Sequence, residues 1–242
     1  MGPGYREEFG RHLWESPHEE GAECAGLPSE SRKSPETDAR SKGAGAPPQE
    51  IQGDDEQQSQ ATGFENLVKR DFDIDRPDQV YAADITYVWT QEGWLYLAVV
   101  IDLCTRKVVG WSMSSRMKTQ LVCDALQMAI WRRQPKAGLI HHSDRGSQYA
   151  SKAFRRLLKA HGIEGSMSRK GDCWDNAVVE SFFGTLKQER VQWRNYQSRY
   201  EAQQDILDYI SMFYNSRRLH SHLGYMSPND FERQLTETKK AA

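Results

Sequence analysis

YAADITYVWT (residues 81–90) and GWLYLAVVIDL (residues 93–103) are two apolar runs separated by only two residues. Both are rich in β-branched and aromatic residues, the side chains that fit best on the surface of a β-sheet. Two such runs with a two-residue connection predict an antiparallel hairpin. A third apolar run at 107–113 predicts a third strand, which would complete a meander.

The patterns that follow predict helices alternating with two more short strands. In residues 119–133 apolar side chains recur at helical spacing, and Pro135 lies just beyond the last of them. The other expected elements are a strand at 138–142, a helix at 151–161 closed by Gly162, an extended piece at 163–166, and helices at 176–190, at 199–214 and after Ser227-Pro228. This order is typical of an α/β domain with one mixed sheet flanked by helices.

The first 63 residues differ in composition from the rest of the chain. They hold 13 Asp/Glu and 6 Lys/Arg, a net charge of −7, whereas residues 64–242 hold 21 acids and 26 bases, a net charge of +5. Because residues 1–63 show no sustained apolar periodicity, they cannot bury enough surface to offset their ordering entropy, and we expect them to be disordered. The basic body is compatible with a polyanionic partner.

Two interpretations of this acidic front stay open: a genuine acidic tail, or an out-of-frame remnant of a DNA-binding domain. Codons allowed for residues 31–63, read one base along, yield strings resembling ERVQRLMREAKG and then KKFKVTTNSSHRLP. The first string has helical apolar spacing and the second is basic, which is typical of the end of a helix-turn-helix and its linker. Residues 64–77 are expected to form a linker to the domain that begins near residue 78.

The four cysteines form no Cys-x-x-Cys pair and show no metal spacing, which indicates a reducing compartment. No apolar run approaches the roughly 18 residues of a membrane span, and the N-terminus lacks a basic stretch followed by an apolar one. We therefore expect a soluble, cytoplasmic protein with no membrane partner.

Three acids stand where metal-binding side chains would be placed. Asp84 interrupts an apolar strand, Asp144 follows the fourth strand, and Glu180 lies on the helix that starts near residue 176. Carboxylates on rigid elements suit Mg²⁺ or Mn²⁺, which bind few protein ligands and keep positions for water and phosphate. Each acid taken alone has a simpler interpretation: a strand acid satisfied by a neighbour, a turn residue, and a solvated helix position, respectively.

A known pattern joins the three acids. HHSDRGSQY (141–149), DITY (84–87) and DNAVVESFFGTLKQE (175–189) resemble the integrase core of bacterial insertion-sequence transposases, the OrfB-like group with an Asp-Asp-Glu (DDE) triad. Thirty-five residues separate Asp144 from Glu180, the spacing that names the D,D(35)E class. The resemblance runs from about residue 66 to residue 232 and includes YNSRRLHSHLGYMSPNDFE near its end.

The resemblance implies an RNase H-like fold as in retroviral integrases, with a catalytic core at 78–190 and a helical C-terminal part at 191–242. It implies an enzyme of transposition that cleaves DNA and transfers strands, and so carries out DNA integration and recombination with two Mg²⁺ or Mn²⁺ ions. Asp84, Asp144 and Glu180 are the implied catalytic residues and metal ligands. The implied partners are double-stranded DNA, at element ends and target, and further copies of the chain, on the nucleoid of a bacterial cell.

Basic and polar residues near these acids are candidates for DNA contact. Lys187 lies seven residues after Glu180, on the same helical face, and resembles the family's basic residue that contacts terminal DNA; the alternative is a surface lysine. The others expected to touch phosphates or bases are Arg145, Gln148, Ser168, Arg169 and Lys170. Gly171-Asp172 is expected to belong to a mobile loop.

The other candidate contacts are weaker. Arg217 and Arg218 belong to a basic cluster for which a DNA or partner-protomer contact and a solvated turn both stay open, while His220 and His222 make a poor zinc site. Trp111 and Trp174 could stack on a base, although core packing is favoured for Trp111.

The sequence departs from the family pattern in two places. Tyr81 stands where the family usually has tryptophan, a conservative change. The family's N-terminal DNA-binding region is not recognisable in frame, so we expect a separate or fused DNA-binding transposase subunit as a partner. Two alternative functions stay open: a nuclease on the same fold, and an inactive remnant that only binds DNA or a transposase partner.

Overall fold

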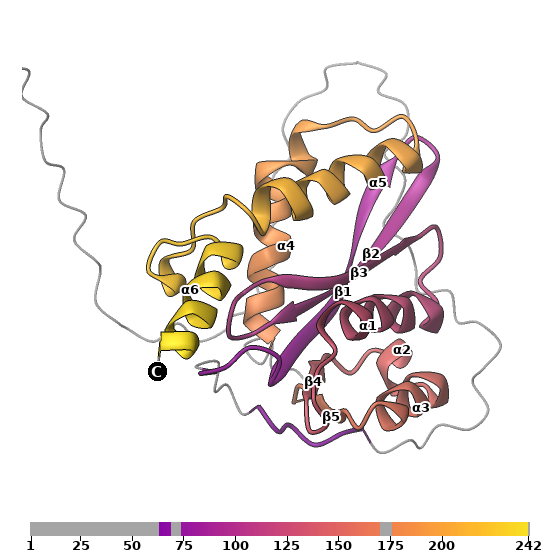
Figure 1. Ribbon diagram of the computed structural model, residues 1–242. Coiled ribbons are helices and arrows are strands. Elements are labelled where there is room, and N and C mark those ends of the chain that lie inside the picture. Colours follow the sequence, from indigo (N-terminus) through magenta and orange to yellow (C-terminus); the bar gives the residue numbers. More distant parts are fainter. Residues whose placement is uncertain (1–62, 69–73, 170–175, 242) are drawn as a thin grey trace, which may run out of the picture. The chain divides into compact units, whose positions relative to one another are not determined.

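A five-stranded sheet with the order β3-β2-β1-β4-β5 organises the described part of the chain (Figure 1). The structure is a computed structural model that describes residues 63–68, 74–169 and 176–241, all within one compact unit, Pro48–Ala242. Its strands are β1 (Val80–Thr90), β2 (Gly93–Asp102), β3 (Val108–Ser114), β4 (Ile140–Ser143) and β5 (Glu164–Met167). The first three form an antiparallel meander, and β4 and β5 extend it in parallel. The predicted mixed sheet is therefore confirmed.

The β1–β2 hairpin closes at the two-residue connection that the sequence indicated. Thr90 pairs with Gly93, and the Thr90 hydroxyl donates a 2.7 Å hydrogen bond to the Gly93 carbonyl oxygen. Gly93 has φ +101°, a backbone conformation that glycine adopts without the clash a side chain would cause. The tight turn fixes the register of the whole hairpin. As in any β-strand, alternate residues of β1 face opposite sides of the sheet.

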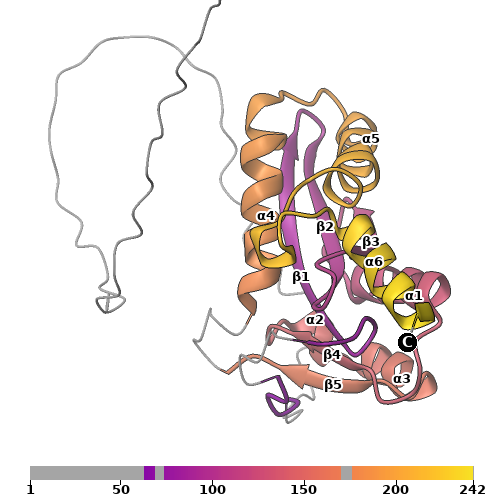
Figure 2. The ribbon, with the colours of Figure 1, turned by 60° about the vertical axis from the view of Figure 1, so that its left-hand side comes forward.

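Helices cover both faces of the sheet. On one face lie α1 (Thr119–Arg133) and α3 (Lys152–Ala160), which share a core with Tyr81 and Ala83. On the other face lie α4 (Ala177–Glu189) and α5 (Arg199–Asp208), which share a core with Ala82 (Figure 2). The alternation of core membership along β1 is what a strand buried on both faces requires.

The structure adds short elements that periodicity did not reveal. A four-residue helix, α2 (Ser147–Ala150), follows the acidic turn after β4, and a 3-10 turn, η2 (Val191–Trp193), follows α4. The helix expected at 199–214 changes at Tyr209 into a π-helical segment, η3 (Tyr209–Tyr214), where the Asn215 amide donates to the Ile210 carbonyl at 3.1 Å. A wide turn of this kind depends on tertiary packing, here of the Tyr214 ring against Phe182.

Residues 63–68 run against β5. The Leu67 amide donates to the Ser166 hydroxyl at 2.9 Å. The Phe64 ring lies over Gly165, where a Cβ would meet three ring atoms at 2.6 Å, so any larger residue at 165 would displace the ring. The first residues of the expected 64–77 linker are thus in contact with the sheet. Residues 1–62 lie outside the described residues.

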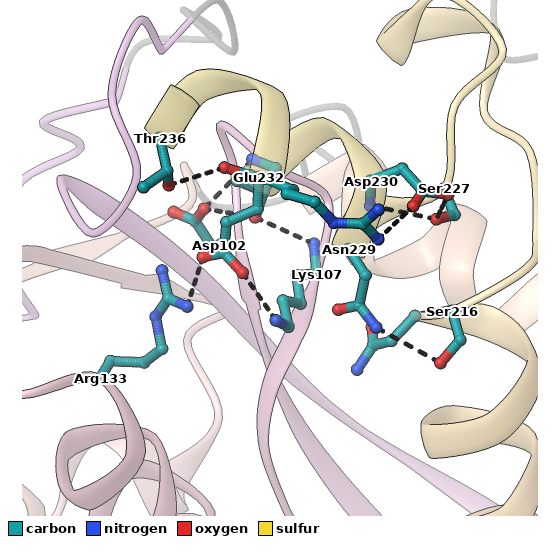
Figure 3. A network of polar contacts seen from close by, with 12 residues as sticks. Asp102, Lys107, Arg133, Ser216, Ser227, Asn229, Asp230, Glu232 and Thr236 are labelled. Atoms are coloured by element: carbon teal, nitrogen blue, oxygen red, sulfur yellow. Dashed lines mark hydrogen bonds and ion pairs between the residues drawn. The ribbon is translucent and has the colours of Figure 1, made fainter. Parts of the chain in front are cut away.

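The last helix, α6 (Pro228–Ala241), is fastened to the sheet by an ion-pair network (Figure 3). Arg133 at the end of α1 donates from Nε and Nη2 to the two oxygens of Asp78, at 2.8 and 2.9 Å, and its Nη1 pairs with Glu232 of α6. The second Glu232 oxygen accepts from Lys107 Nζ at 2.7 Å. One guanidinium therefore links three segments that are far apart in sequence.

Among the described residues, no helix is both long and apolar enough to cross a bilayer. Of the cysteines that the structure describes, Cys104 and Cys123 form no disulfide.

We predict that Arg133→Met lowers the free energy of unfolding by about 2 kcal/mol. In this largely buried site Asp78 would lose its ion pair with Arg133, and Glu232 would keep only its ion pair with Lys107. Urea denaturation followed by circular dichroism would measure it. Arg233→Met is the matched control: its pair with Asp230 is exposed, at 67% and 48% for the two side chains, and should contribute less than about 0.5 kcal/mol. Equal losses in the two variants would contradict the linking role of Arg133.

Candidate active site

The parallel pairing of β1 with β4 brings two of the three acids together. The last registered pair is Ala83 with Ser143, and the next residue on each strand is an aspartate, Asp84 and Asp144. Residues that follow a registered pair in neighbouring strands lie about 5 Å apart in the backbone. Asp84 and Asp144 are therefore neighbours even though 59 residues lie between them in the sequence.

Asp144 is held by the turn that follows β4. Its Oδ1 accepts a 3.0 Å hydrogen bond from the Gly146 amide. Gly146 has φ −56°, which any residue can adopt, so glycine at this position is not explained by a backbone conformation that only glycine adopts. The reason is space: a Cβ at 146 would lie 3.0 Å from Asp144 Oδ1 and 3.1 Å from Gln148 Oε1.

Glu180 comes from α4, whose N-terminal end is tied to β1. The Asn176 side-chain amide donates to the Ala83 carbonyl oxygen at 3.3 Å, next to Asp84. Val179, Phe182, Phe183 and Leu186 are buried against the sheet, which leaves Glu180 on the exposed side of the helix. One polar anchor and one apolar stripe thus fix the position of Glu180.

The three acids act on one another electrostatically. Burial, together with the negative charges of Asp144 and Glu180, raises the pKa of Asp84 to about 7, against a lowering hydrogen bond from the Ile85 amide. Burial also raises the pKa of Asp144, while the Gly146 amide opposes the rise. In the described part of the chain, no lysine or arginine forms an ion pair with any of the three.

The donor set fits a hard divalent cation, since it consists of carboxylate oxygens with uncompensated charge. The side chains are not fully gathered: within the described ranges, no three His, Cys, Asp or Glu side chains lie close enough to hold a metal ion.

Tyr149 is a residue of this site that sequence reasoning did not single out. Its ring is buried at 1% exposure, and its hydroxyl has no hydrogen-bond partner among the residues that the structure describes. Burial, followed by the charges of Asp84 and Asp144, raises its pKa far above the ordinary value, so the hydroxyl stays protonated beside the acids. The sequence feature that could have indicated Tyr149 is its place at the end of HHSDRGSQY, five residues after Asp144, as an aromatic residue with a polar hydroxyl.

The two histidines that precede Asp144 belong to the core. His141 is buried beside Phe154, and burial lowers its pKa to about 3, so its ring is neutral. His142 contacts the Ser166 hydroxyl at 2.8 Å and the Ser168 hydroxyl at 3.2 Å. Ser168, an expected DNA contact, is buried and engaged in this way.

The other expected DNA contacts near the acids are partly engaged within the chain. Arg145 is exposed, and its Nε donates to the Ser168 carbonyl at 2.9 Å. Gln148 reaches the Met117 carbonyl at 3.5 Å, a weak contact, and Arg169 is exposed at the end of a described range. Lys170, Gly171-Asp172 and Trp174 lie outside the described residues.

Lys187 is exposed on α4, and its Nζ lies 5.3 Å from the centre of the Tyr87 ring. Arg218 pairs with Glu189 at 3.0 Å, and Arg217 lines an open pocket with Tyr209, Met212 and Phe213.

Three further residues have structural roles. His222 contacts Arg106 at 2.8 Å, and the His220 ring packs against Tyr214. Trp111 is a core residue, as favoured, with Arg132 over its ring at 4.2 Å.

We predict that Asp84→Asn makes the metal-free fold more stable at alkaline pH. Between the ordinary pKa of 3.8 and about 7, the folded protein holds a proton on Asp84 that the unfolded chain releases, so wild-type stability falls as pH rises through this range. The variant lacks this fall and should be more stable at pH 8 by about 2–4 kcal/mol, with the difference vanishing near pH 4.

Urea denaturation in EDTA across this pH range measures the effect. Glu164→Gln, which removes an exposed acid on β5, is the control and should change stability little. If the wild type were no less stable than Asp84→Asn at pH 8, burial and the neighbouring acids would not raise the pKa of Asp84 as stated.

Comparison with known proteins identifies the family to which the domain is similar. Two family models, both described as Integrase core domain, match residues 74–173 and residues 180–235. Transposase InsF for insertion sequence IS3fB of Escherichia coli is 53% identical over 170 residues, covering 70% of this chain and 59% of that protein. The transposase for insertion sequence element IS904 of Lactococcus lactis is 48% identical, covering 69% and 66%.

The fold has its own support. A chain of the simian T-cell lymphotropic virus intasome, solved in complex with a PP2A regulatory subunit, superposes with a TM-score of 0.55 at 16% identity, covering 66% of this chain and 55% of that chain. The described chain spans about three fifths of the length of the first curated relatives it matches. It belongs to the insertion-sequence transposases that carry a retroviral integrase-like core domain.

Proposed function

We propose that this chain is the catalytic part of a DDE transposase, which cuts the end of a mobile element and joins it to target DNA. The observation that carries the proposal is the register of β1 with β4, which sets Asp84 beside Asp144, with Glu180 of α4 within electrostatic reach. Three uncompensated carboxylates on three rigid elements form a site whose charge is suited to divalent cations and, through them, to phosphate.

The residues divide the work according to their positions. Asp84 and Asp144 would hold Mg²⁺ or Mn²⁺ from adjacent strands, and Glu180 would complete the site from the helix. Two such ions would activate the attacking hydroxyl and stabilise the leaving oxygen. Because transesterification conserves the phosphodiester bond, the chain needs only to position the strands and neutralise charge. The protonated hydroxyl of Tyr149 supplies a hydrogen-bond donor beside the acids.

Double-stranded DNA and further copies of the chain are the proposed partners, because joining two element ends to a target brings several DNA segments to one complex. Lys187, Arg145, Gln148, Arg169, Lys170, Arg217 and Arg218 are the proposed DNA contacts. Of the described ones, Lys187 has the best position, since it shares a helical face with Glu180. A DNA-binding transposase subunit, separate or fused, would supply recognition of element ends, and the complex would act on the bacterial nucleoid.

We predict that Asp144→Asn and Glu180→Gln each reduce strand transfer at least about 1,000-fold, because a neutral amide cannot hold the cation. The measurement is joining of a pre-cut, labelled end duplex to plasmid DNA with Mg²⁺ or Mn²⁺. Glu164→Gln is the charge-matched control. Retained activity in either triad variant would sink the assignment of the site, and metal-dependent cutting without joining would identify a nuclease instead.

We predict that Lys187→Ala weakens binding of the same duplex about 5- to 10-fold at 100 mM salt and lowers the slope of log K against log salt by about one, since one phosphate contact is lost. Fluorescence anisotropy over a salt series measures both. Lys159→Ala removes an exposed lysine from the last turn of α3 and serves as the control. An unchanged slope for Lys187→Ala would mean that this lysine makes no phosphate contact and is only a solvated surface residue.

A further inference from the structure

Three aromatic side chains gather at the far end of the β1–β2 hairpin: Tyr87, Trp89 and Trp94, here named the aromatic face. The Tyr87 and Trp94 rings meet edge to face with centroids 4.9 Å apart, and those of Trp89 and Trp94 are 4.8 Å apart. Tyr87 and Trp89 remain 43% and 41% exposed. Cross-strand aromatic pairs stabilise a hairpin, but that role does not require two large rings of one strand to stay so open to solvent.

The exposure has a structural cause. Ile85, Tyr87 and Trp89 alternate along β1 and share one face of the sheet. Ile85 packs against the core formed with α1 and α3, whereas Tyr87 and Trp89 belong to neither core in the part of the chain that the structure describes. The helices thus cover this face up to Ile85, and the hairpin carries its aromatic residues beyond them.

The aromatic face shares β1 with Asp84, and Lys187, which contacts this face, shares α4 with Glu180. Tyr87 is three residues past Asp84 on β1, about 10 Å along a strand. Lys187 is seven residues past Glu180 on α4, also about 10 Å along a helix. Tyr87 and Lys187 therefore lie side by side, and Lys187 Nζ is 5.3 Å from the centre of the Tyr87 ring.

Contacts at both ends keep α4 beside β1. Figure 2 shows α4 alongside β1. The Asn176 side-chain amide donates to the Ala83 carbonyl before α4 begins, and the Tyr196 carbonyl accepts from the Gln91 amide at 3.0 Å after α4 ends. The pairing with β4 stops at Ala83 while β1 continues to Thr90. No described strand therefore covers this edge of β1 past Asp84, and Lys187 can reach Tyr87 around it.

We propose that the aromatic face is a stacking surface for unpaired bases at the DNA end whose phosphate is held by the carboxylates. The distance fits, because about 10 Å along β1 from Asp84 to Tyr87 corresponds to roughly three nucleotides of a DNA strand. Asp84 and Tyr87 face opposite sides of the sheet, so the strand would pass around the uncovered edge of β1, where Lys187 contacts the Tyr87 ring. The composition fits as well: an ammonium for the backbone stands next to open π-faces for the bases, the combination found in single-strand binding surfaces. The inference rests on the proposed function for the identity of the substrate and adds a base-contacting surface to it.

The test is a double-mutant cycle between the protein and the DNA. A labelled duplex with a short single-stranded end is titrated with wild type and with Trp89→Ala, in Ca²⁺ so that binding is measured without turnover. The same titration uses a duplex whose overhang bases are replaced by abasic sites. Trp89→Ala should weaken binding of the normal overhang about tenfold, and binding of the abasic one less than about twofold, because only the first offers rings to stack. Trp89→Phe should retain most of the affinity.

Trp131→Ala is the matched control, since Trp131 on α1 is a tryptophan 73% exposed and outside the aromatic face. Equal effects of Trp89→Ala on both duplexes, or none, would overturn the proposal. So would a loss of protein self-association in Trp89→Ala, seen by sedimentation, without a base-dependent change in affinity, which would make the face a protein interface. A base-dependent loss in a protein that never joins strands would uphold the stacking surface and remove the proposed function.

Discussion

The parallel pairing of β1 with β4 is the constraint on which the site depends. A register shift of one residue would turn the side chains of β4 to the opposite face, so Asp144 would point away from Asp84. The register is protected by burial on both sides: Tyr81 and Ala83 pack under α1 and α3, while Ala82 packs under α4 and α5. Two apolar cores therefore determine where two charges meet.

The same pairing explains why α4 is the element that completes the site. β4 ends at Ser143, and the edge of β1 beyond Ala83 is left to the helix. Asn176 bonds to the last paired carbonyl of β1, so the first turns of α4 begin at the level of Asp84. Glu180 is one turn further on. The 35 residues between Asp144 and Glu180 include α2, α3, β5 and the first residues of α4.

Much of this could be predicted from the sequence, and the exceptions have physical reasons. The hairpin, the helix at 119–133 and the amphipathic α4 follow from local periodicity, and the family resemblance joined the three acids. The π-helical segment Tyr209–Tyr214 could not be foreseen, because its widened turn depends on Tyr214 packing against Phe182, a contact between distant segments. The reason for Gly146 was also hidden, since the carboxylate that crowds it is placed by the fold and not by the turn alone.

The acids that fasten α6 and the acids of the candidate active site differ in whether their charges are paired. Asp78 and Glu232 are matched by Arg133 and Lys107 at short distances, so their charges are compensated and they fasten α6 to the sheet. Asp84, Asp144 and Glu180 have no such base among the described residues, and burial together with the charges of the other two acids raises the pKa of Asp84. A bound cation would reverse that rise, because it favours the ionised form of each ligand. A cation bound by these acids would therefore stabilise the fold as well as serve the chemistry.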